Sequence, residues 1–209
     1  MNRIFFENGN ILLRKGNKKD SESVALLIYS SGSDAFNFMH YNKINALKYI
    51  EYEFKTSFPS LFGRTYAWVG EDKQGKVISS AITYGTKENY LMTLGTIIKT
   101  ILFYKFSSIK ALKRLFVMGK ITKPPKNKEW FLSCFGVLPS LRGKGLGEII
   151  FKQQMEWAKE NGYTIYGLDV SENNPRAKIL YQRMGFKEIE YKISITKKVP
   201  NLYKLEVKL

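Results

Sequence analysis

The spacing of apolar residues along the chain predicts alternating helices and strands. In the first half, an apolar stripe between residues 24 and 28 follows a short strand and a polar turn that ends near Asp20, a residue suited to a helix N-terminus. A second helical period covers about residues 35–58. Two alternating segments, one ending at Val69 and one spanning residues 76–84, flank a polar turn, so we expect a β-hairpin there.

The second half of the chain alternates more regularly between strand and helix. Residues 129–139, EWFLSCFGVLP, are nearly all apolar up to the proline, which predicts a buried central strand. An amphipathic helix follows and ends at the Asn-Gly pair 161–162. Residues 163–170 predict another buried strand, followed by a helix and two alternating strands that we expect to pair. This order predicts one domain over residues 1–209, with a mixed α/β sheet and a β-α-β unit at its centre.

Residues 89–128 differ from the rest of the chain. They carry an apolar helical period with nine cations and no carboxylate, which predicts a basic amphipathic helical insertion before the central strand. The cations are Lys99, Lys105, Lys110, Lys113, Arg114, Lys120, Lys123, Lys126 and Lys128. Aromatic residues at 103, 104 and 106 have the spacing of a packed core, although such rings can also line an acceptor pocket.

The overall charge bears on partners rather than on the fold. The formal net charge of +16 suits a polyanion, such as nucleic acid, acidic lipid headgroups or a multiply phosphorylated cofactor, and equally suits a solvated surface. One cysteine, Cys134, and one histidine, His40, argue against a disulfide framework and a metal site. The N-terminus has no apolar signal segment and lysines interrupt the most apolar stretch, so we expect a cytoplasmic protein.

A glycine-rich turn, RGKGLG at residues 142–147, lies between the central strand and the next helix. Such a turn presents unpaired backbone N–H groups at a helix N-terminus, which favours binding of a phosphate. The ATP-type loop requires Ser or Thr after Gly143-Lys144, where Gly145 stands, and the dinucleotide fingerprint requires glycine at position 148, where Glu148 stands. Neither of these two phosphate loops is present.

A second motif follows one strand later. Asn174 precedes Pro175 as a helix cap, and Ala177, Tyr181 and the pair Gly185-Phe186 follow at helical spacing. The first motif is Arg142-x-x-Gly-x-Gly147 with the preceding Val-x-Pro, and the second is the one just described. With both motifs, the chain resembles the GNAT superfamily of N-acetyltransferases over about residues 129–186. The resemblance implies an acyl-CoA N-acyltransferase fold, with a mixed, mostly antiparallel sheet of about six to seven strands flanked by helices.

The resemblance also implies a binding mode for acetyl-CoA. The central strand and the strand at 163–170 are expected to splay apart and to hold the acyl-pantetheine arm between them, while the glycine-rich turn binds the pyrophosphate. The cofactor-binding residues that follow from it are Phe135, Gly136, Val137, Arg142, Gly143, Lys144, Gly145, Leu146, Gly147, Asn174, Ala177 and Tyr181. No metal is expected.

The implied chemistry is direct attack of a primary amine on the thioester in a ternary complex. The resemblance places the Tyr181 hydroxyl beside the sulfur as the general acid and makes the Val137 N–H an oxyanion donor. Family members often carry a carboxylate where this chain has Ser133. The identity of the general base therefore remains open: it could be Ser133, Glu129 at the strand start or a water chain, or the reaction could need no base. We interpret Cys134 as a core thiol.

An alternative function is a basic acyl-CoA-sensing or polyanion-binding module with little or no catalysis, docked on nucleic acid or an anionic membrane through residues 89–128. No nucleic-acid motif accompanies the charge, which argues against nucleic acid as the main partner. We expect a small-molecule or peptide amine as acceptor, acidic acceptors included, and a monomer or homodimer. The sequence does not identify the acceptor.

Overall fold

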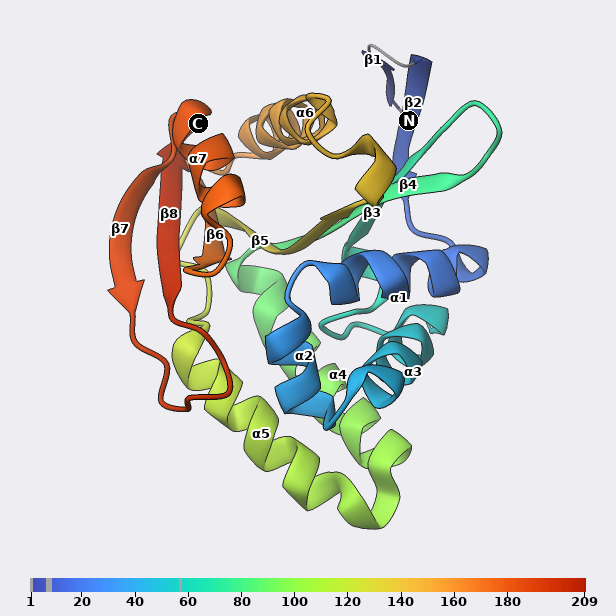
Figure 1. Ribbon diagram of the computed structural model, residues 1–209, viewed down its shortest axis with the longest axis vertical. Helices are drawn as coiled ribbons and strands as arrows, with labels where there is room; N and C mark the ends of the chain where they lie inside the picture. Colours follow the sequence, from blue (N-terminus) through green and yellow to red (C-terminus); the bar gives the residue numbers. More distant parts are fainter. Residues whose placement is uncertain (1, 7–8, 57) are drawn as a thin grey trace.

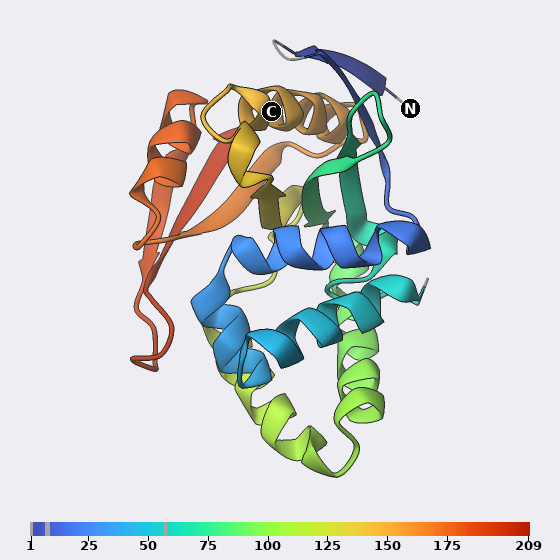
Figure 2. The same ribbon diagram turned by 45° about the vertical axis from the view of Figure 1, so that its right-hand side comes forward.

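The computed structural model describes residues 2–6, 9–56 and 58–209 (Figures 1 and 2). The strands are β1 (Asn2–Phe6), β2 (Gly9–Lys15), β3 (Ala67–Glu71), β4 (Val77–Tyr84), β5 (Glu129–Val137), β6 (Ile165–Ser171), β7 (Lys187–Lys192) and β8 (Leu202–Lys208). The helices are α1 (Ser21–Ser30), α2 (Ser33–His40), α3 (Lys43–Lys55), α4 (Thr86–Tyr104), α5 (Ser108–Ile121), α6 (Leu146–Glu160) and α7 (Pro175–Arg183). Four short 3-10 segments join them: η1 (Lys18–Asp20), η2 (Arg64–Tyr66), η3 (Lys105–Ser107) and η4 (Pro139–Leu141).

The described strands form one sheet in the order β1-β2-β3-β4-β5-β6-β8-β7. Among the described strands only β5 and β6 are parallel neighbours, and every other pair is antiparallel. This confirms the predicted mixed, mostly antiparallel sheet, the hairpin β3–β4 and the terminal hairpin β7–β8. The sheet has eight strands within the described ranges, because β1 pairs with β2 at one edge and extends the expected set.

The sheet forks between its two central strands. The parallel ladder joins Glu129–Leu132 of β5 to Ile165–Leu168 of β6 and ends there, although both strands continue. On the other side of β5, Ile82 pairs with Cys134 and Thr83 with Leu132, so Ser133 is the extra residue of a β-bulge. Because a bulge bends its strand, it gives a local reason for β5 to leave β6 at this point.

Helices cover both faces of the sheet (Figure 1). Side chains that alternate along the strands pack under the helices on each face. On one face, Trp130 and Leu168 pack with Phe151 of α6 and Tyr181 of α7. On the other face, residues of β4 and β5 such as Phe131 pack against the helices α1 to α3. The helices α4 and α5 extend away from the sheet below this second face (Figures 1 and 2).

The single helical period expected over residues 35–58 is two helices. Tyr41 has φ 76°, and the Asn42 side chain accepts a hydrogen bond from the Asn45 N–H at 2.9 Å, so a new helix starts at Lys43. Asparagine is a strong N-cap, and a residue at positive φ ends a helix. The apolar period continues across the break, which is why spacing alone does not reveal it. The predicted insertion is present as α4, η3 and α5, with α4 starting at Thr86.

Candidate active site

The glycine-rich turn lies between β5 and the N-terminus of α6. Gly143 and Gly145 have φ of 80° and 81°, values that side chains rarely adopt. A Cβ on Gly143 would also lie 2.5 Å from Nη2 of Arg176, which reaches over the turn from α7. The positive φ of both glycines therefore sets the shape of the turn, and Gly143 leaves room for the Arg176 guanidinium.

The turn ends in a helix N-terminus with free donors. The first intrahelical hydrogen bond of α6 runs from the Ile149 N–H to the Gly145 carbonyl at 3.3 Å, so the N–H groups that precede it have no partner within the helix. Together with the helix dipole they favour an anion. Arg142 donates from Nε to the Val137 carbonyl at 2.9 Å and from Nη2 to the Ser30 hydroxyl at 3.2 Å, which holds the turn to the end of β5.

A cleft of about 460 Å³ opens between the diverging strands β5 and β6. Most of the residues expected to bind the cofactor line it: Phe135, Gly136, Val137, Arg142, Gly143, Gly145, Gly147, Asn174, Ala177 and Tyr181. Two expected residues do not line it. Leu146 is buried in the core with Ile150, and the exposed side chain of Lys144 lies outside the cleft.

The backbone of β5 directs donors into the cleft. The Leu138 N–H bonds to Ile78 of β4 at 2.9 Å, and Val137 lies opposite Ser79. Because backbone groups alternate along an antiparallel strand, the N–H groups of Val137 and Phe135 point away from β4, toward the fork. Gly136 lets the end of α1 approach this strand, since a Cβ there would collide with the Leu27 carbonyl.

Tyr181 projects from α7 into the cleft wall. Its ring packs against Phe151 and Phe186 at centroid distances of 5.3 and 5.7 Å, and the residue is 7% exposed. Burial raises the pKa of its hydroxyl well above the ordinary tyrosine value. Within the described residues this hydroxyl has no hydrogen-bond partner, so it is a neutral donor available to a bound group.

Ser133 and Cys134 lie at the fork itself and line the cleft. Their side chains are 3.7 Å apart, from Oγ to Sγ. Burial raises the pKa of the Cys134 thiol to about 11, although hydrogen bonds from Ser133 and Ser31 oppose this. The thiol is therefore neutral near pH 7, which agrees with its interpretation as a core residue rather than a nucleophile.

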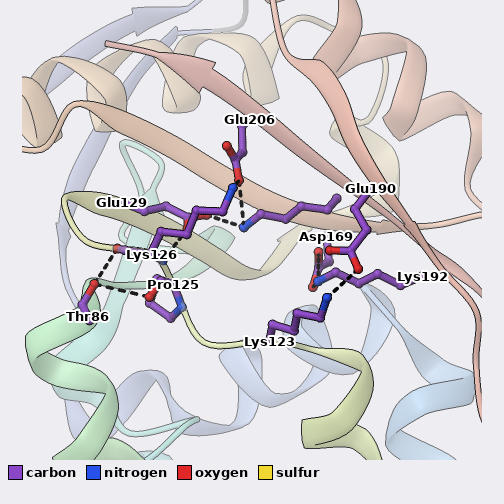
Figure 3. Close-up of polar contacts among 10 residues, drawn as sticks. Thr86, Lys123, Pro125, Lys126, Glu129, Asp169, Glu190, Lys192 and Glu206 are labelled. Atoms are coloured by element: carbon purple, nitrogen blue, oxygen red, sulfur yellow. Dashed lines mark hydrogen bonds and ion pairs between the residues drawn. The ribbon is translucent and has the colours of Figure 1, made fainter.

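Glu129 lies outside the cleft, at the opposite end of β5. Its side chain is fully buried, pairs with Lys204 of β8 and accepts a hydrogen bond from the Lys126 N–H at 2.6 Å (Figure 3). The parallel register that opens the fork beyond Leu132 also keeps Glu129 in the paired part of the sheet. The expectation of a catalytic role for Glu129 does not fit this position.

A carboxylate that the sequence interpretation did not single out, Asp169, lines the cleft from β6. Leu132 and Leu168 form the last β5–β6 pair, so Asp169 and Ser133 are the first residues beyond it on the two strands. The Lys192 ammonium donates to both Asp169 oxygens, at 2.8 and 2.9 Å (Figure 3). Burial raises the pKa of Asp169 above its ordinary value, and Lys192 limits the rise.

Two further charged residues of the cleft come from α7. Arg176 lies over Gly143, and Arg183 lines the same cleft one helix length away. Arg176 lies two residues after the Asn174 cap, within the second motif, so its position in the sequence could have identified it as a cleft residue. No three His, Cys, Asp or Glu side chains of residues 2–6, 9–56 and 58–209 gather where they could hold a metal ion.

A sheet forked between two central strands, with an anion-binding helix start at its mouth, is the arrangement expected for an acyltransferase of the acyl-CoA type. The model of the Acetyltransferase (GNAT) family matches residues 50–186, and the chain belongs to this family. Over 59 residues it is 39% identical to the uncharacterized N-acetyltransferase YdgE of Bacillus subtilis (strain 168), a match that spans 28% of this chain and 38% of that protein.

Solved structures agree with the fold. An N-acetyltransferase from Staphylococcus aureus Mu50 superposes with a TM-score of 0.67 at 18% identity, over 94% of this chain and all of the other. A GCN5-related N-acetyltransferase from Kribbella flavida gives a TM-score of 0.57 at 16% identity, over 95% of this chain and 98% of the other. At these identities the likeness concerns the fold.

Proposed function

We propose that this protein is an N-acetyltransferase that moves an acetyl group from acetyl-CoA to a primary amine by direct attack in a ternary complex. One observation carries the proposal: the fork between β5 and β6 and the glycine-rich turn open into the same cleft. A phosphate-binding turn alone fits many ligands. A turn beside a gap lined by free strand N–H groups fits a ligand with a pyrophosphate at one end and an amide-bearing arm.

The residues present fit acetyl-CoA, which when bound supplies the reactive thioester. The N–H groups at the start of α6, with Arg142 and Arg176, would hold the pyrophosphate. The Phe135 and Val137 backbone and the Asn174 side chain would hold the arm from the two sides of the gap. The side-chain oxygen Oδ1 of Asn174 already accepts a hydrogen bond from the Ala177 N–H at 3.1 Å, so its side-chain NH₂ is the part left for a ligand.

Three groups would carry the proton and charge movements. The Val137 N–H stabilises the oxygen that gains charge during transfer, because it is fixed in the strand and points into the gap. Tyr181 would donate a hydrogen bond to the sulfur as negative charge develops there, and would give it a proton that the hydroxyl regains from solvent; burial raises the pKa of this hydroxyl and keeps it neutral. Asp169 takes a proton from the amine, directly or through a water that Ser133 orients.

Asp169 thus fills the role left open by the serine on β5. Both residues line the cleft, each as the first residue beyond the last β5–β6 pair, which supports a carboxylate on β6 serving the same space. Its raised pKa makes it a stronger base than an exposed aspartate. We propose that the whole chain acts as one catalytic domain whose acceptor is a small-molecule or peptide amine.

The test is release of free thiol from acetyl-CoA with a panel of amines, amino acids, polyamines and peptides, alongside the melting temperature with and without acetyl-CoA. We expect a higher melting temperature with the cofactor and release with at least one acceptor class. A thermal shift without release from any acceptor would favour acyl-CoA sensing. Neither shift nor release would overturn the proposal.

A further inference from the structure

Helix α4 exposes a row of apolar side chains, and apart from Met92 and Gly95 the residues that it buries are polar. Tyr90, Leu91, Leu94, Ile97, Ile98, Ile101 and Leu102 are all exposed and follow each other at helical spacing, so they form one continuous stripe, called here the α4 stripe. Phe106 in η3, directly after the helix, is 101% exposed. A helix that packs on a protein core shows the opposite arrangement.

Specific contacts fix this orientation. The Lys99 ammonium, on the buried side, donates to the Glu53 and Phe58 carbonyls at 3.1 and 3.0 Å and to the Ser60 hydroxyl at 2.8 Å. The Leu61 N–H donates to the Thr96 hydroxyl at 2.8 Å.

The same side is also sterically fixed. A Cβ on Gly95 would collide with the Pro59 carbonyl, so α4 packs there through bare backbone. Turning the helix to bury the stripe would break all of these contacts at once. The stripe is therefore left for something outside the molecule.

The charge around the stripe selects the occupant. Of the nine cations in residues 89–128, Lys99 is buried, and Lys123 and Lys126 pair with Glu190 and Glu206. The side chains of Lys105, Lys110, Lys113 and Lys120 are exposed in a segment that contains no carboxylate. A second copy of this surface would bring these lysines together, whereas an anionic surface would neutralise them.

We propose that the α4 stripe and the η3 tip bind an anionic lipid bilayer, lying in its surface. The turn between α4 and α5 lies at the end of the molecule away from β1 and β2, which leaves this tip open to a surface (Figure 2). With 19 residues α4 is about 28 Å long, which gives a long line of contact. None of the described helices has the length and apolarity to cross a bilayer. An apolar stripe with exposed lysines on the adjoining η3 and α5, and an aromatic residue at its end, suits binding within the interface.

The experiment is co-sedimentation with vesicles of phosphatidylcholine alone and of equal parts phosphatidylcholine and phosphatidylglycerol. We expect binding to the anionic vesicles, weakened by salt, and little binding to the neutral ones. The triple variant Leu91→Gln, Ile101→Gln, Leu102→Gln should lower the partition coefficient at least about tenfold, since affinity scales with buried apolar area. The matched control is Ile44→Gln, Ile193→Gln, Ile195→Gln, which changes equally exposed residues elsewhere and should bind as the parent does.

A charge variant tests the other half of the proposal. Lys105→Gln, Lys110→Gln, Lys113→Gln should lower binding roughly a hundredfold, against little change for the exposed lysines in Lys18→Gln, Lys19→Gln, Lys73→Gln. The melting temperature of each variant, with and without acetyl-CoA, shows that the fold and the cleft are intact. This readout separates failure of lipid binding from failure of the proposed acetyltransferase function.

Other occupants give other results. A parent protein that is dimeric in solution and becomes monomeric in the apolar variant, with no vesicle binding, would replace the bilayer by a second copy. Binding to RNA or heparin that is insensitive to the apolar variant, without vesicle binding, would show that only the charge acts. Either outcome overturns the proposal.

Discussion

The cleft at the fork and the α4–α5 hairpin are both basic and both open to solvent, yet they are built in opposite ways. The cleft presents backbone groups: N–H groups of β5 and of the start of α6, in a turn shaped by glycines at positive φ. The hairpin presents side chains, an apolar stripe with lysines around it, on a helix held by a polar underside. A site built from backbone groups needs glycines at fixed spacing, so a short sequence motif identifies it. A site built from exposed side chains is visible in the sequence only as a segment rich in apolar and basic residues.

The difference also separates function from stability. In the proposed mechanism, single side chains of the cleft such as Tyr181 act on a bound group, and their hydroxyl contributes little to the fold beyond the packing of the ring. In α4, single polar side chains such as Lys99 hold the helix in place, and the exposed ones contribute nothing to folding. Substitutions in the two regions should therefore change different measurements.

The largest effect is expected at Tyr181. Tyr181→Phe keeps the ring packed against Phe151 and Phe186 and removes only the proton donor, so kcat should fall about 100-fold or more. The KM for acetyl-CoA and the melting temperature should change little. Steady-state kinetics with the best acceptor checks this, with Tyr203→Phe on β8 as the matched control. An unchanged kcat in the Tyr181 variant would remove the tyrosine from the acid role.

Asp169 should give the next largest effect, with a signature in pH. A base must be ionised, so kcat/KM should fall as the pH drops through the pKa of Asp169, which burial places above the ordinary aspartate value. Asp169→Asn should lower kcat/KM about 100-fold at neutral pH and abolish this acid limb, whereas Glu160→Gln, at an exposed carboxylate, should keep it.

The Asp169 variant leaves the Lys192 ammonium buried without its partner, which costs stability. The double variant Asp169→Asn, Lys192→Met should recover melting temperature and should not recover kcat/KM. Recovery of both would show that the carboxylate supports the fold rather than the reaction.

Much of this fold follows from local patterns. The two motifs place β5, α6, β6 and α7, because glycine turns, an Asn-Pro cap and apolar runs each act over a few residues. Asp169 is different: it lines the same cleft as Ser133 only because two strands separated by a helix pair in parallel up to Leu132 and Leu168. Its role cannot be inferred without knowing where the ladder ends.

The insertion shows the opposite limit. Its apolar period predicts a helix correctly, but apolar spacing is ordinarily taken to mark the buried side. Phe103 and Tyr104 do pack partly on the core, whereas Phe106 is fully exposed. The side that α4 buries is set by Lys99, whose partners come from α3 and the segment that follows it, far away in sequence.

Lys99→Met tests this polar underside. The change removes a hydrogen-bond donor from three oxygen atoms, one of them the backbone carbonyl of Glu53. The Glu53 side chain is itself fully buried, and burial raises the pKa of its carboxyl. We expect the free energy of unfolding to fall by about 1–3 kcal/mol, measured by urea denaturation. Lys105→Met, at an exposed lysine nearby, should change it by less than about 0.5 kcal/mol. Equal losses in both would mean that Lys99 does not orient the helix.

The smallest effect is expected on the opposite side of the same helix. Leu94→Gln replaces an apolar side chain that is 44% exposed, so the free energy of unfolding should change by less than about 0.5 kcal/mol, and kcat should not change. The lysine variant would then lose more free energy of unfolding than the leucine variant. In a helix packed on a core the order is reversed, because losing a buried leucine costs about 2–5 kcal/mol. A loss of that size at Leu94 would mean that the stripe packs within the protein in solution, and the hairpin would then belong to the core and not to a docking surface.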